Sequence, residues 1–274
     1  MNPLAPSAVQ AFRKRINAHY RAGGRDLPWR NTEDPYRILV SEVMLQQTQV
    51  ERVIGKYGEF LAAFPDFPAL AAAPLPRLLR IWQGMGYNRR GLMLRALART
   101  VVADHQGRLP ADPEILRGLP GIGPYTAGAI MAFAFNRAVV FLDTNIRRVY
   151  LDAFFPGREK VRDAEILPLL LQTLDRRNPR RWYNALMDYG ALLKAGRANP
   201  NQRSAHYARQ GRFENSDRQA RGRILKALVA GSPLSAAGIV RATGVEAARV
   251  EKNLLALERE AFIERKGRRY VLRA

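Results

Sequence analysis

The chain has 274 residues, of which 47% are hydrophobic and 25% are charged, a balance typical of a globular protein with one or two domains. Its 45 Lys and Arg outnumber its 24 Asp and Glu and give a net charge of +21, so a polyanion such as nucleic acid is the expected partner. It has no cysteine and only three histidines, which excludes disulfides and thiolate metal sites and argues against a histidine-rich metal site.

Helical periodicity dominates up to about residue 195, and strand signals are nearly absent there. The pattern predicts helices over residues 7–21, 36–64 with a break near the middle, 75–83, 88–104, 112–118, 124–135, 143–155, 164–176 and 182–194. In the first helix, Ala11, Phe12 and Ile16 share an apolar stripe. The helix over 88–104 is amphipathic, and we expect its arginines on the outer face.

The last third of the sequence has a different character. Residues 196–216 are polar, basic and rich in Asn, Arg and Ser, which predicts a linker or loop. Three helices are predicted over 217–229, 235–243 and 245–260, with Ser216 and Ser235 as caps. The tail FIERKGRRYVLRA alternates about a central Lys-Gly and predicts a β-hairpin, so residues 217–274 are expected to form a small winged helix-turn-helix-like domain.

The segment LPGIGPYTAGAI, residues 119–130, predicts a tight hairpin between two helices. Gly121 and Gly123 permit backbone angles and close approaches that other residues do not. Asp112 can cap the preceding helix, and Pro124 suits the first turn of the following one. Unpaired N–H groups at a helix N-terminus form an anion site by geometry, although an ordinary turn between core helices is the alternative.

Two carboxyl groups are candidates for acid–base chemistry. Glu42, in SEVMLQQTQ, has aliphatic helical neighbours that should raise its pKa and suit it to donate a proton near neutral pH. Asp143, in LDTN, should accept backbone N–H bonds at a helix start, where the dipole keeps it ionised and Asn145 can orient it. Such a pair fits glycosidic cleavage; the alternatives are a solvent-facing glutamate and a plain helix cap.

Polar and aromatic residues near two predicted turns could enter a base stack. Gln46, Gln47 and Thr48 form either a solvated helix face or a set of groups that read base edges. Tyr87, in GMGYN, is either a core residue or a wedge between bases. Tyr125, directly after the hairpin, is either core or the wall of a pocket.

Four motifs, in this order and spacing, resemble those of the helix-hairpin-helix DNA glycosylases, and within them the MutY-type adenine glycosylases. They cover about residues 8–194 and are LPWRNTEDPYRILVSEVMLQQTQV, GMGYNRRG, LPGIGPYTAGAIMAFAF and LDTNIRRV. The resemblance implies an all-α, two-lobed fold with a six-helix barrel over 31–136 and a second lobe from 1–30 and 137–195. It also implies base flipping into a cleft between the lobes.

Residue roles carry over motif by motif. Glu42 matches the acid that protonates adenine N7, Asp143 the carboxylate that stabilises the oxocarbenium ion, and Asn145 its companion amide. Tyr125 stands where bifunctional relatives carry a nucleophilic lysine, so the resemblance implies a monofunctional enzyme. The residues that match DNA contacts of the family, in the duplex or on a phosphate, are Gln46, Gln47, Thr48, Tyr87, Leu119, Gly121, Ile122, Gly123 and Arg147.

The sequence departs from the family pattern in two places. MutY-type enzymes normally hold a [4Fe–4S] cluster through four cysteines after a helix like MDYGALL. This chain has no cysteine, so we expect no cofactor and a basic loop that contacts DNA in its place. They also usually carry a C-terminal Nudix-like domain that reads 8-oxoguanine, where this chain has only the small domain over 217–274.

We therefore expect a monofunctional DNA glycosylase that acts on double-stranded DNA, most simply on a mispaired or damaged adenine. A mismatch thymine/uracil glycosylase of the same superfamily and a non-catalytic DNA-binding regulator are the alternatives. The C-terminal domain could bind a protein partner. No stretch reaches about 18 consecutive apolar residues and the N-terminus lacks a signal-peptide core, so a cytoplasmic, nucleoid-associated monomer without a membrane span is expected.

Overall fold

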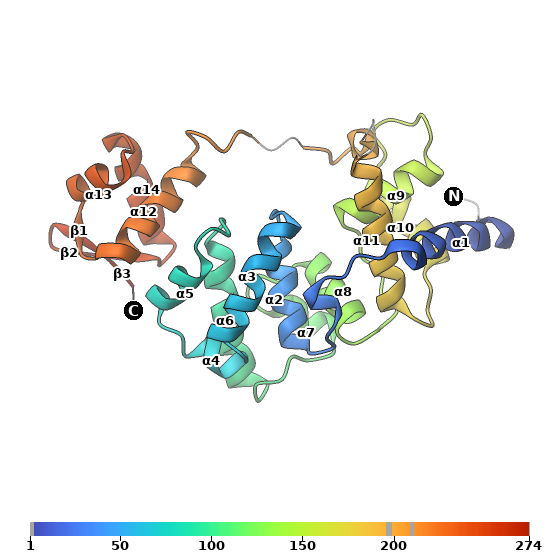
Figure 1. The fold of residues 1–274 in the computed structure, drawn as a ribbon, viewed down its shortest axis with the longest axis horizontal. Coiled ribbons are helices and arrows are strands. Elements are labelled where there is room, and N and C mark those ends of the chain that lie inside the picture. Colours follow the sequence, from blue (N-terminus) through green and yellow to red (C-terminus); the bar gives the residue numbers. More distant parts are fainter. Residues whose placement is uncertain (1–2, 196–198, 209–210, 274) are drawn as a thin grey trace. The chain divides into compact units, whose positions relative to one another are not determined.

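A computed structural model describes residues 3–195, 199–208 and 211–273 (Figure 1). The helices are α1 (Pro6–Gly23), α2 (Pro35–Leu45), α3 (Val50–Ala63), α4 (Phe67–Ala71), α5 (Leu75–Trp82), α6 (Arg89–Asp104), α7 (Pro113–Gly118), α8 (Pro124–Phe133), α9 (Thr144–Phe154), α10 (Asp163–Thr173), α11 (Pro179–Ala195), α12 (Asp217–Gly231), α13 (Ala236–Thr243) and α14 (Ala247–Arg259). Two short 3-10 helices, η1 (Pro28–Arg30) and η2 (Pro200–Arg203), complete the helical elements. The strands are β1 (Leu234–Ser235), β2 (Ile263–Lys266) and β3 (Arg269–Leu272).

The predicted helices are confirmed within a few residues, including the break after Leu45, whereas η1, α4, η2 and β1 were not predicted. Contacts divide the chain into two compact units, the first from residues 1–42 and 110–209 and the second from residues 43–109 and 210–274. The lobe and domain boundaries predicted from the sequence stay a prediction. Their residues 1–2, 196–198, 209–210 and 274 lie outside the described residues. None of the described helices combines the length and apolar character that crossing a membrane requires.

An aromatic core holds the first unit together. Phe12 and Ile16 of α1 are buried, whereas Ala11, predicted on the same stripe, is exposed. The Phe12 ring centroid lies 5.4 Å from that of Tyr150 in α9 and 6.0 Å from that of Trp182 in α11. Because such rings bury large apolar areas, they hold α1, α9 and α11 side by side (Figure 1).

The predicted hairpin joins α7 to α8 in the same unit. The Asp112 carboxylate accepts the N–H groups of Glu114 and Ile115 at 2.8 and 3.0 Å, which confirms it as the cap of α7. Leu119 and Ile122 are buried and anchor the loop. Gly121 has a φ of +79°, a left-handed conformation that favours glycine.

The second unit packs α3 to α6 around Trp82, which Gly91 of α6 approaches so closely that an added Cβ would lie 3.0 Å from the indole. The expectation that the arginines of α6 face outward is wrong for Arg95. That side chain is buried, and its guanidinium donates to the carbonyl of Ala73 at 3.0 Å. The carbonyl follows the unpredicted α4, so no pattern within α6 could reveal the contact.

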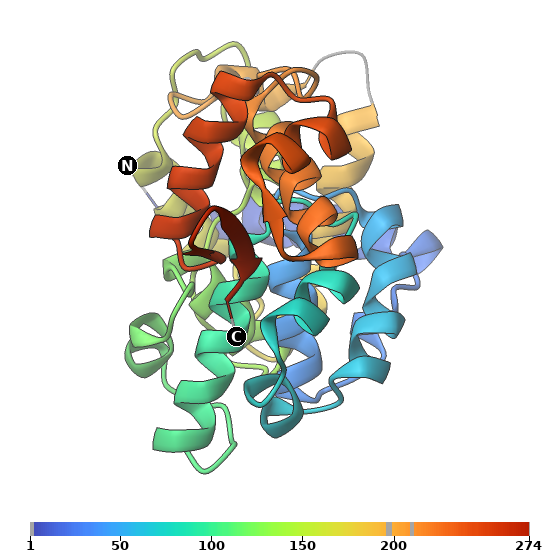
Figure 2. The ribbon, with the colours of Figure 1, turned by 90° about the vertical axis from the view of Figure 1, so that its left-hand side faces the viewer.

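Residues 217–272 form three helices and a three-stranded sheet with the strand order β1-β3-β2. The hairpin of β2 and β3 is the dark red pair of strands near the C-terminus in Figure 2. Ser216 and Ser235 accept the N–H groups of Gln219 and Gly238, which confirms both predicted caps. The hairpin pairs Lys266 with Arg269 and leaves a two-residue turn at its tip. This arrangement of helices and hairpin is that of a winged helix, as the sequence predicted.

Candidate active site

Glu42 lies on α2 with only 7% of its surface exposed. The hydroxyl of Tyr125, at the start of α8, donates a hydrogen bond to its Oε2 at 3.2 Å. Burial raises the pKa of Glu42 to about 7, the nearby Asp143 charge adds to the rise, and the Tyr125 bond and the Arg30 charge oppose it. The predicted rise is therefore present, and this carboxyl exchanges its proton in the neutral range.

Asp143 caps α9 as predicted. Its Oδ1 accepts the Ile146 N–H at 2.7 Å, and its Oδ2 accepts Nδ2 of Asn145 at 3.2 Å. Burial nevertheless raises the pKa of Asp143, and the hydrogen bonds to Ile146 and Asn145 only moderate the effect. The expectation drew on the cap and the helix dipole alone, which both lower the pKa, and burial outweighs them.

The two carboxyl groups share one electrostatic environment. The Asp143 charge raises the pKa of Glu42, and burial together with the charges of Glu42 and Asp143 raises the pKa of Tyr125 well above its usual value. The phenol therefore keeps its proton and acts as a hydrogen-bond donor. The ring centroid of Tyr125 lies 5.7 Å from that of Phe141, an edge-to-face contact that helps to fix the phenol.

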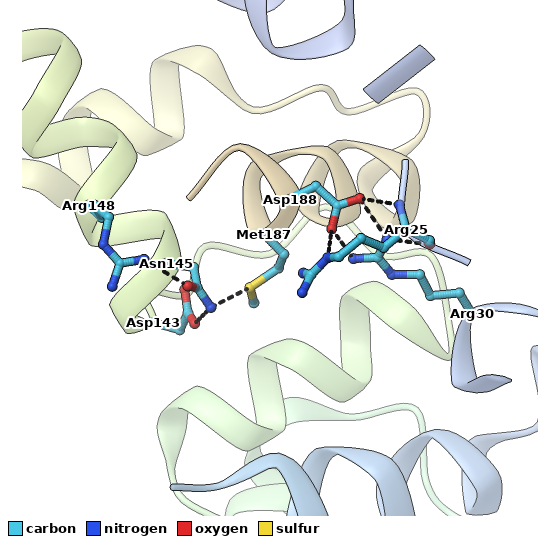
Figure 3. Close-up of polar contacts among 7 residues, drawn as sticks. All are labelled: Arg25, Arg30, Asp143, Asn145, Arg148, Met187 and Asp188. Atoms are coloured by element: carbon cyan, nitrogen blue, oxygen red, sulfur yellow. Dashed lines mark hydrogen bonds and ion pairs between the residues drawn. The ribbon is translucent and has the colours of Figure 1, made fainter. Parts of the chain in front are cut away.

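The orientation of Asn145 is set by residues that the sequence did not single out (Figure 3). Arg148, with 3% of its surface exposed, donates to Oδ1 of Asn145 at 3.0 Å and to the carbonyl of Gly190 at 2.6 Å. With its oxygen held by Arg148, the amide directs its Nδ2 to Asp143 and to the Met187 sulfur. One partner of Arg148 belongs to its own helix and another to α11, so the pattern of α9 alone could not reveal this role.

Gly190 explains how α11 comes so close to the start of α9. An added Cβ at this position would lie 2.5 Å from the carbonyl oxygen of Asn145, which is too close for any residue other than glycine. A glycine inside a helix also lowers helical stability, so its presence in MDYGALL was the available sequence signal.

A buried ion-pair cluster lies next to this site (Figure 3). Asp188 of α11, 3% exposed, accepts bonds from the side chains of Arg25 and Arg30 at 2.6 to 2.9 Å. Burial alone would raise the pKa of Asp188, but Arg30 and Arg25 hold it below its usual range. Arg30 also lowers the pKa of Glu42, so the cluster fixes a positive charge near the candidate acid.

The hairpin leaves two backbone N–H groups without an acceptor in the described part of the chain, and its role as an anion site stays a prediction. Gly121 is exposed and Gly123 half-buried, and their N–H groups have no acceptor among the described residues. Arg147 differs from the other predicted DNA contacts, because its guanidinium forms two bonds of 2.7 Å with Asp163. Its charge is thereby neutralised within the protein, which does not favour the predicted phosphate contact.

The two predicted duplex-entering turns belong to the second unit, and Arg90 joins them. Its guanidinium donates to the carbonyls of Val43, Met44 and Gln46 and to Thr48 Oγ1 on one side, and to the carbonyls of Met85 and Gly86 on the other. Gln47 and Tyr87, one on each turn, have φ values of +54° and +44°, a conformation that costs free energy in residues other than glycine. Gln46, Gln47 and Thr48 thus form a turn and not the helix face that was the alternative.

Tyr87 has a further partner in the same unit. Arg218 of α12 donates to its hydroxyl at 2.7 Å, and the Arg218 and Arg90 guanidinium carbons lie 5.8 and 5.5 Å from its ring centroid. The ring is therefore held between two cations, which fixes its position at the turn.

The residues after α11 do not fit an iron–sulfur cluster. No cysteine is present, and among the described residues no three His, Asp or Glu side chains come together as a metal site. Instead, Asn201 donates to the carbonyl of Thr144 at 2.9 Å, and Arg203 donates to those of Leu151 and Phe155. These carbonyls of α9 and its C-cap occupy the Arg203 guanidinium, which does not favour a DNA contact there, and the predicted DNA-contacting loop stays a prediction.

Comparison with known proteins shows the family to which the chain belongs. Residues 40–167 match the HhH-GPD superfamily of base excision DNA repair proteins. An adenine DNA glycosylase of Mycobacterium tuberculosis is 36% identical over 273 residues, which cover 90% of this chain and 88% of that protein. The chain belongs to the HhH-GPD superfamily. The predicted MutY-like DNA glycosylase of base excision repair and its all-α helix-hairpin-helix fold are confirmed, and the non-catalytic regulator is set aside.

Two further relatives bear on the choice of base. A thymine/uracil-DNA glycosylase of Methanothermobacter thermautotrophicus is 32% identical over 191 residues, covering 69% of this chain and 86% of that protein. A solved structure described as a thermostable thymine-DNA glycosylase superposes with a TM-score of 0.63 at 28% identity, covering 71% of this chain and 91% of that one. Members of one superfamily with different target bases thus share this fold.

Proposed function

We propose that the chain is a monofunctional adenine DNA glycosylase that extrudes a mispaired adenine from duplex DNA and hydrolyses its N-glycosidic bond. The observation that carries the proposal is a buried carboxyl, Glu42, with a pKa of about 7, beside a second carboxyl at a helix cap. A half-protonated acid near neutral pH can give its proton to a departing purine.

The two carboxyl groups then have separate tasks. Protonated Glu42 transfers its proton to N7 of adenine, and the electron pair of the breaking C1′–N9 bond leaves with the base. The sugar becomes an oxocarbenium ion, which Asp143 stabilises while Asn145 holds the carboxylate in place. Water then adds to C1′ and releases a proton.

Tyr125 supports a monofunctional reaction. A lyase of this superfamily uses a lysine at this position, whereas a phenol with a raised pKa is a poor nucleophile. We infer that Tyr125 instead adjusts the proton affinity of Glu42 through its hydrogen bond. No step of this route needs a metal or a cofactor.

DNA is the proposed partner throughout. The free amides of Gly121 and Gly123 suit a phosphate, and the basic chain supplies the long-range attraction. Gln47 and Tyr87 would enter the duplex around the extruded base, and Arg90 is their positioning residue. Such an enzyme would work as a monomer at the nucleoid.

Removal of thymine or uracil is the second candidate, and the two relatives named for those bases favour it. Glu42 favours adenine, because a leaving purine gains from protonation at N7. The opposite base is left to experiment.

A panel of duplexes decides between the candidates. Wild type and Asp143→Asn are incubated with A opposite 8-oxoguanine, A opposite G, T opposite G and U opposite G, followed by hot alkali. The proposal expects wild type to give breaks only after alkali and only in the adenine duplexes, and Asp143→Asn to bind without cutting. Breaks confined to T or U duplexes would establish the second candidate, and full activity of Asp143→Asn would remove that residue from the mechanism.

A further inference from the structure

The hairpin formed by β2 and β3, called the wing below, concentrates positive charge far along the chain from the candidate active site. Its cations are Arg265, Lys266, Arg268, Arg269 and Arg273, and all five are exposed. Its one acid, Glu264, pairs with Lys266 at 2.9 Å. No carboxylate among the described residues pairs with the remaining four arginines.

The fold holds this charge in a defined shape. Ile263 is buried at the base, β3 pairs with both β1 and β2, and Arg265 donates to the carbonyl of Gly267 across the tip. At the end of the ladder, Lys266 lies directly opposite Arg269. Like charges in such a pair destabilise a hairpin, so the free protein bears a cost that a bound anion would remove.

The second helix of the helix-turn-helix, α14, does not present a comparable group of unpaired positive charges. Its cap is Glu246, and its first turn presents Ala247 and Ala248, which have no groups for reading base edges. Arg249 and Lys252 further along α14 are turned to Asp217 at 4.0 and 2.7 Å. Arg249 and Lys252 are thus paired and only Arg259 remains, at the C-terminal end of α14, so the positive charge left for a ligand is concentrated on the wing.

We propose that the wing is a second DNA-binding site, which takes the phosphates of duplex DNA outside the lesion without reading sequence. Closely spaced, unpaired guanidinium groups suit phosphate oxygens, and a helix without base-reading groups gives no sequence preference. The inference rests on the proposed function in one respect, that duplex DNA is the substrate.

The test compares Arg268→Gln/Arg269→Gln with a control, Arg176→Gln/Arg177→Gln, which removes an equal charge from an exposed pair between α10 and α11. The affinity of the full chain for an undamaged 30-base-pair duplex is measured against salt concentration. If each wing arginine neutralises one phosphate, the slope of log K against log salt falls by about 1.8 in the wing variant. The control keeps its slope.

Folding and activity separate the possible failures. The wing variant should melt at or above the wild-type temperature, because it removes the like-charge pair, and it should excise at the wild-type rate once enzyme is saturating. An unchanged salt slope in a folded wing variant would overturn the proposal and leave an acidic protein surface as the partner to test. A wild type that excises nothing while the slope still falls would refute the proposed function and leave the wing site standing.

Discussion

Tyr125→Phe is expected to move the alkaline limb of the excision rate to higher pH. Glu42 acts in its protonated form, so the wild-type rate falls as pH rises through about 7 and drops tenfold per unit beyond it. The Tyr125 hydroxyl bonds to the Glu42 carboxylate and lowers its pKa. Without that bond the proton is held more tightly, and the limb moves upward.

The size of the shift follows from the bond. A hydrogen bond to a charged group contributes about 1.5 kcal/mol at its weaker end, which suits a length of 3.2 Å. One pKa unit corresponds to 1.36 kcal/mol, so the limb should move by about one unit. At pH 8 the protonated fraction then rises from about one tenth to about one half, and the variant should be about fivefold faster than wild type relative to its own plateau.

The assay uses enzyme below saturation, because the second-order rate constant reports the pKa of the free protein. Rates on the adenine duplex are followed from pH 5.5 to 9. Tyr183→Phe is the matched control, since its hydroxyl bonds to the Val139 carbonyl and does not contact Glu42, and its limb should stay near 7. A limb that stays or moves down in Tyr125→Phe, with a wild-type limb near 7, would refute this account of the proton donor.

Three further results are expected. Glu42→Gln should abolish excision but unfold at a higher urea concentration than wild type at pH 8. A carboxyl whose pKa rises from 4.5 to about 7 on folding lowers the free energy of unfolding by about 3 kcal/mol between pH 4.5 and 8. Glutamine does not titrate, so the variant avoids this loss. Gly123→Val should keep the wild-type melting temperature, since an added Cβ meets nothing within 4 Å, but bind all duplexes about tenfold more weakly by crowding the phosphate. In Arg90→Lys the single ammonium group cannot bond to both turns at once. The fluorescence of 2-aminopurine beside the mismatch should therefore increase less on binding, and excision should slow about tenfold.

Each result has a contrary outcome. Equal pH dependence of unfolding in wild type and Glu42→Gln would mean that Glu42 titrates alike in both states. Unaltered affinity of Gly123→Val would leave the hairpin a structural turn. Arg90→Lys with normal 2-aminopurine fluorescence but slow excision would assign Arg90 a role other than positioning the turns.

The sequence predicted what depends on neighbours along the chain. The Asp112 cap, the proline starts of α7 and α8 and the apolar surroundings of Glu42 are all local, so their residue types and spacing suffice. Asp143 was likewise placed at a helix cap, but the depth of its burial depends on distant elements, and that decided the direction of its pKa.

Buried and half-buried arginines were the main failure. Arg90 and Arg95 were expected on the outer face of their helix, because arginine in an amphipathic helix is usually solvated, and Arg148 was not singled out. Each instead donates to backbone carbonyls of a segment more than 20 residues away. Such carbonyls leave no trace in the sequence, since every residue has one.

The contacts of Asn201 and Arg203 with α9 have a consequence for the conditions under which this protein keeps its shape. MutY-type relatives are expected to hold the region after α11 together with an iron–sulfur cluster. In this chain, amide and guanidinium groups of that region instead donate hydrogen bonds to backbone carbonyls of Thr144, Leu151 and Phe155. Because the chain has no cysteine, no thiolate-held cluster can lie at that junction for peroxide to oxidise. The backbone around Thr144, next to the carboxylate of Asp143, is thus held by hydrogen bonds that the polypeptide supplies when it folds.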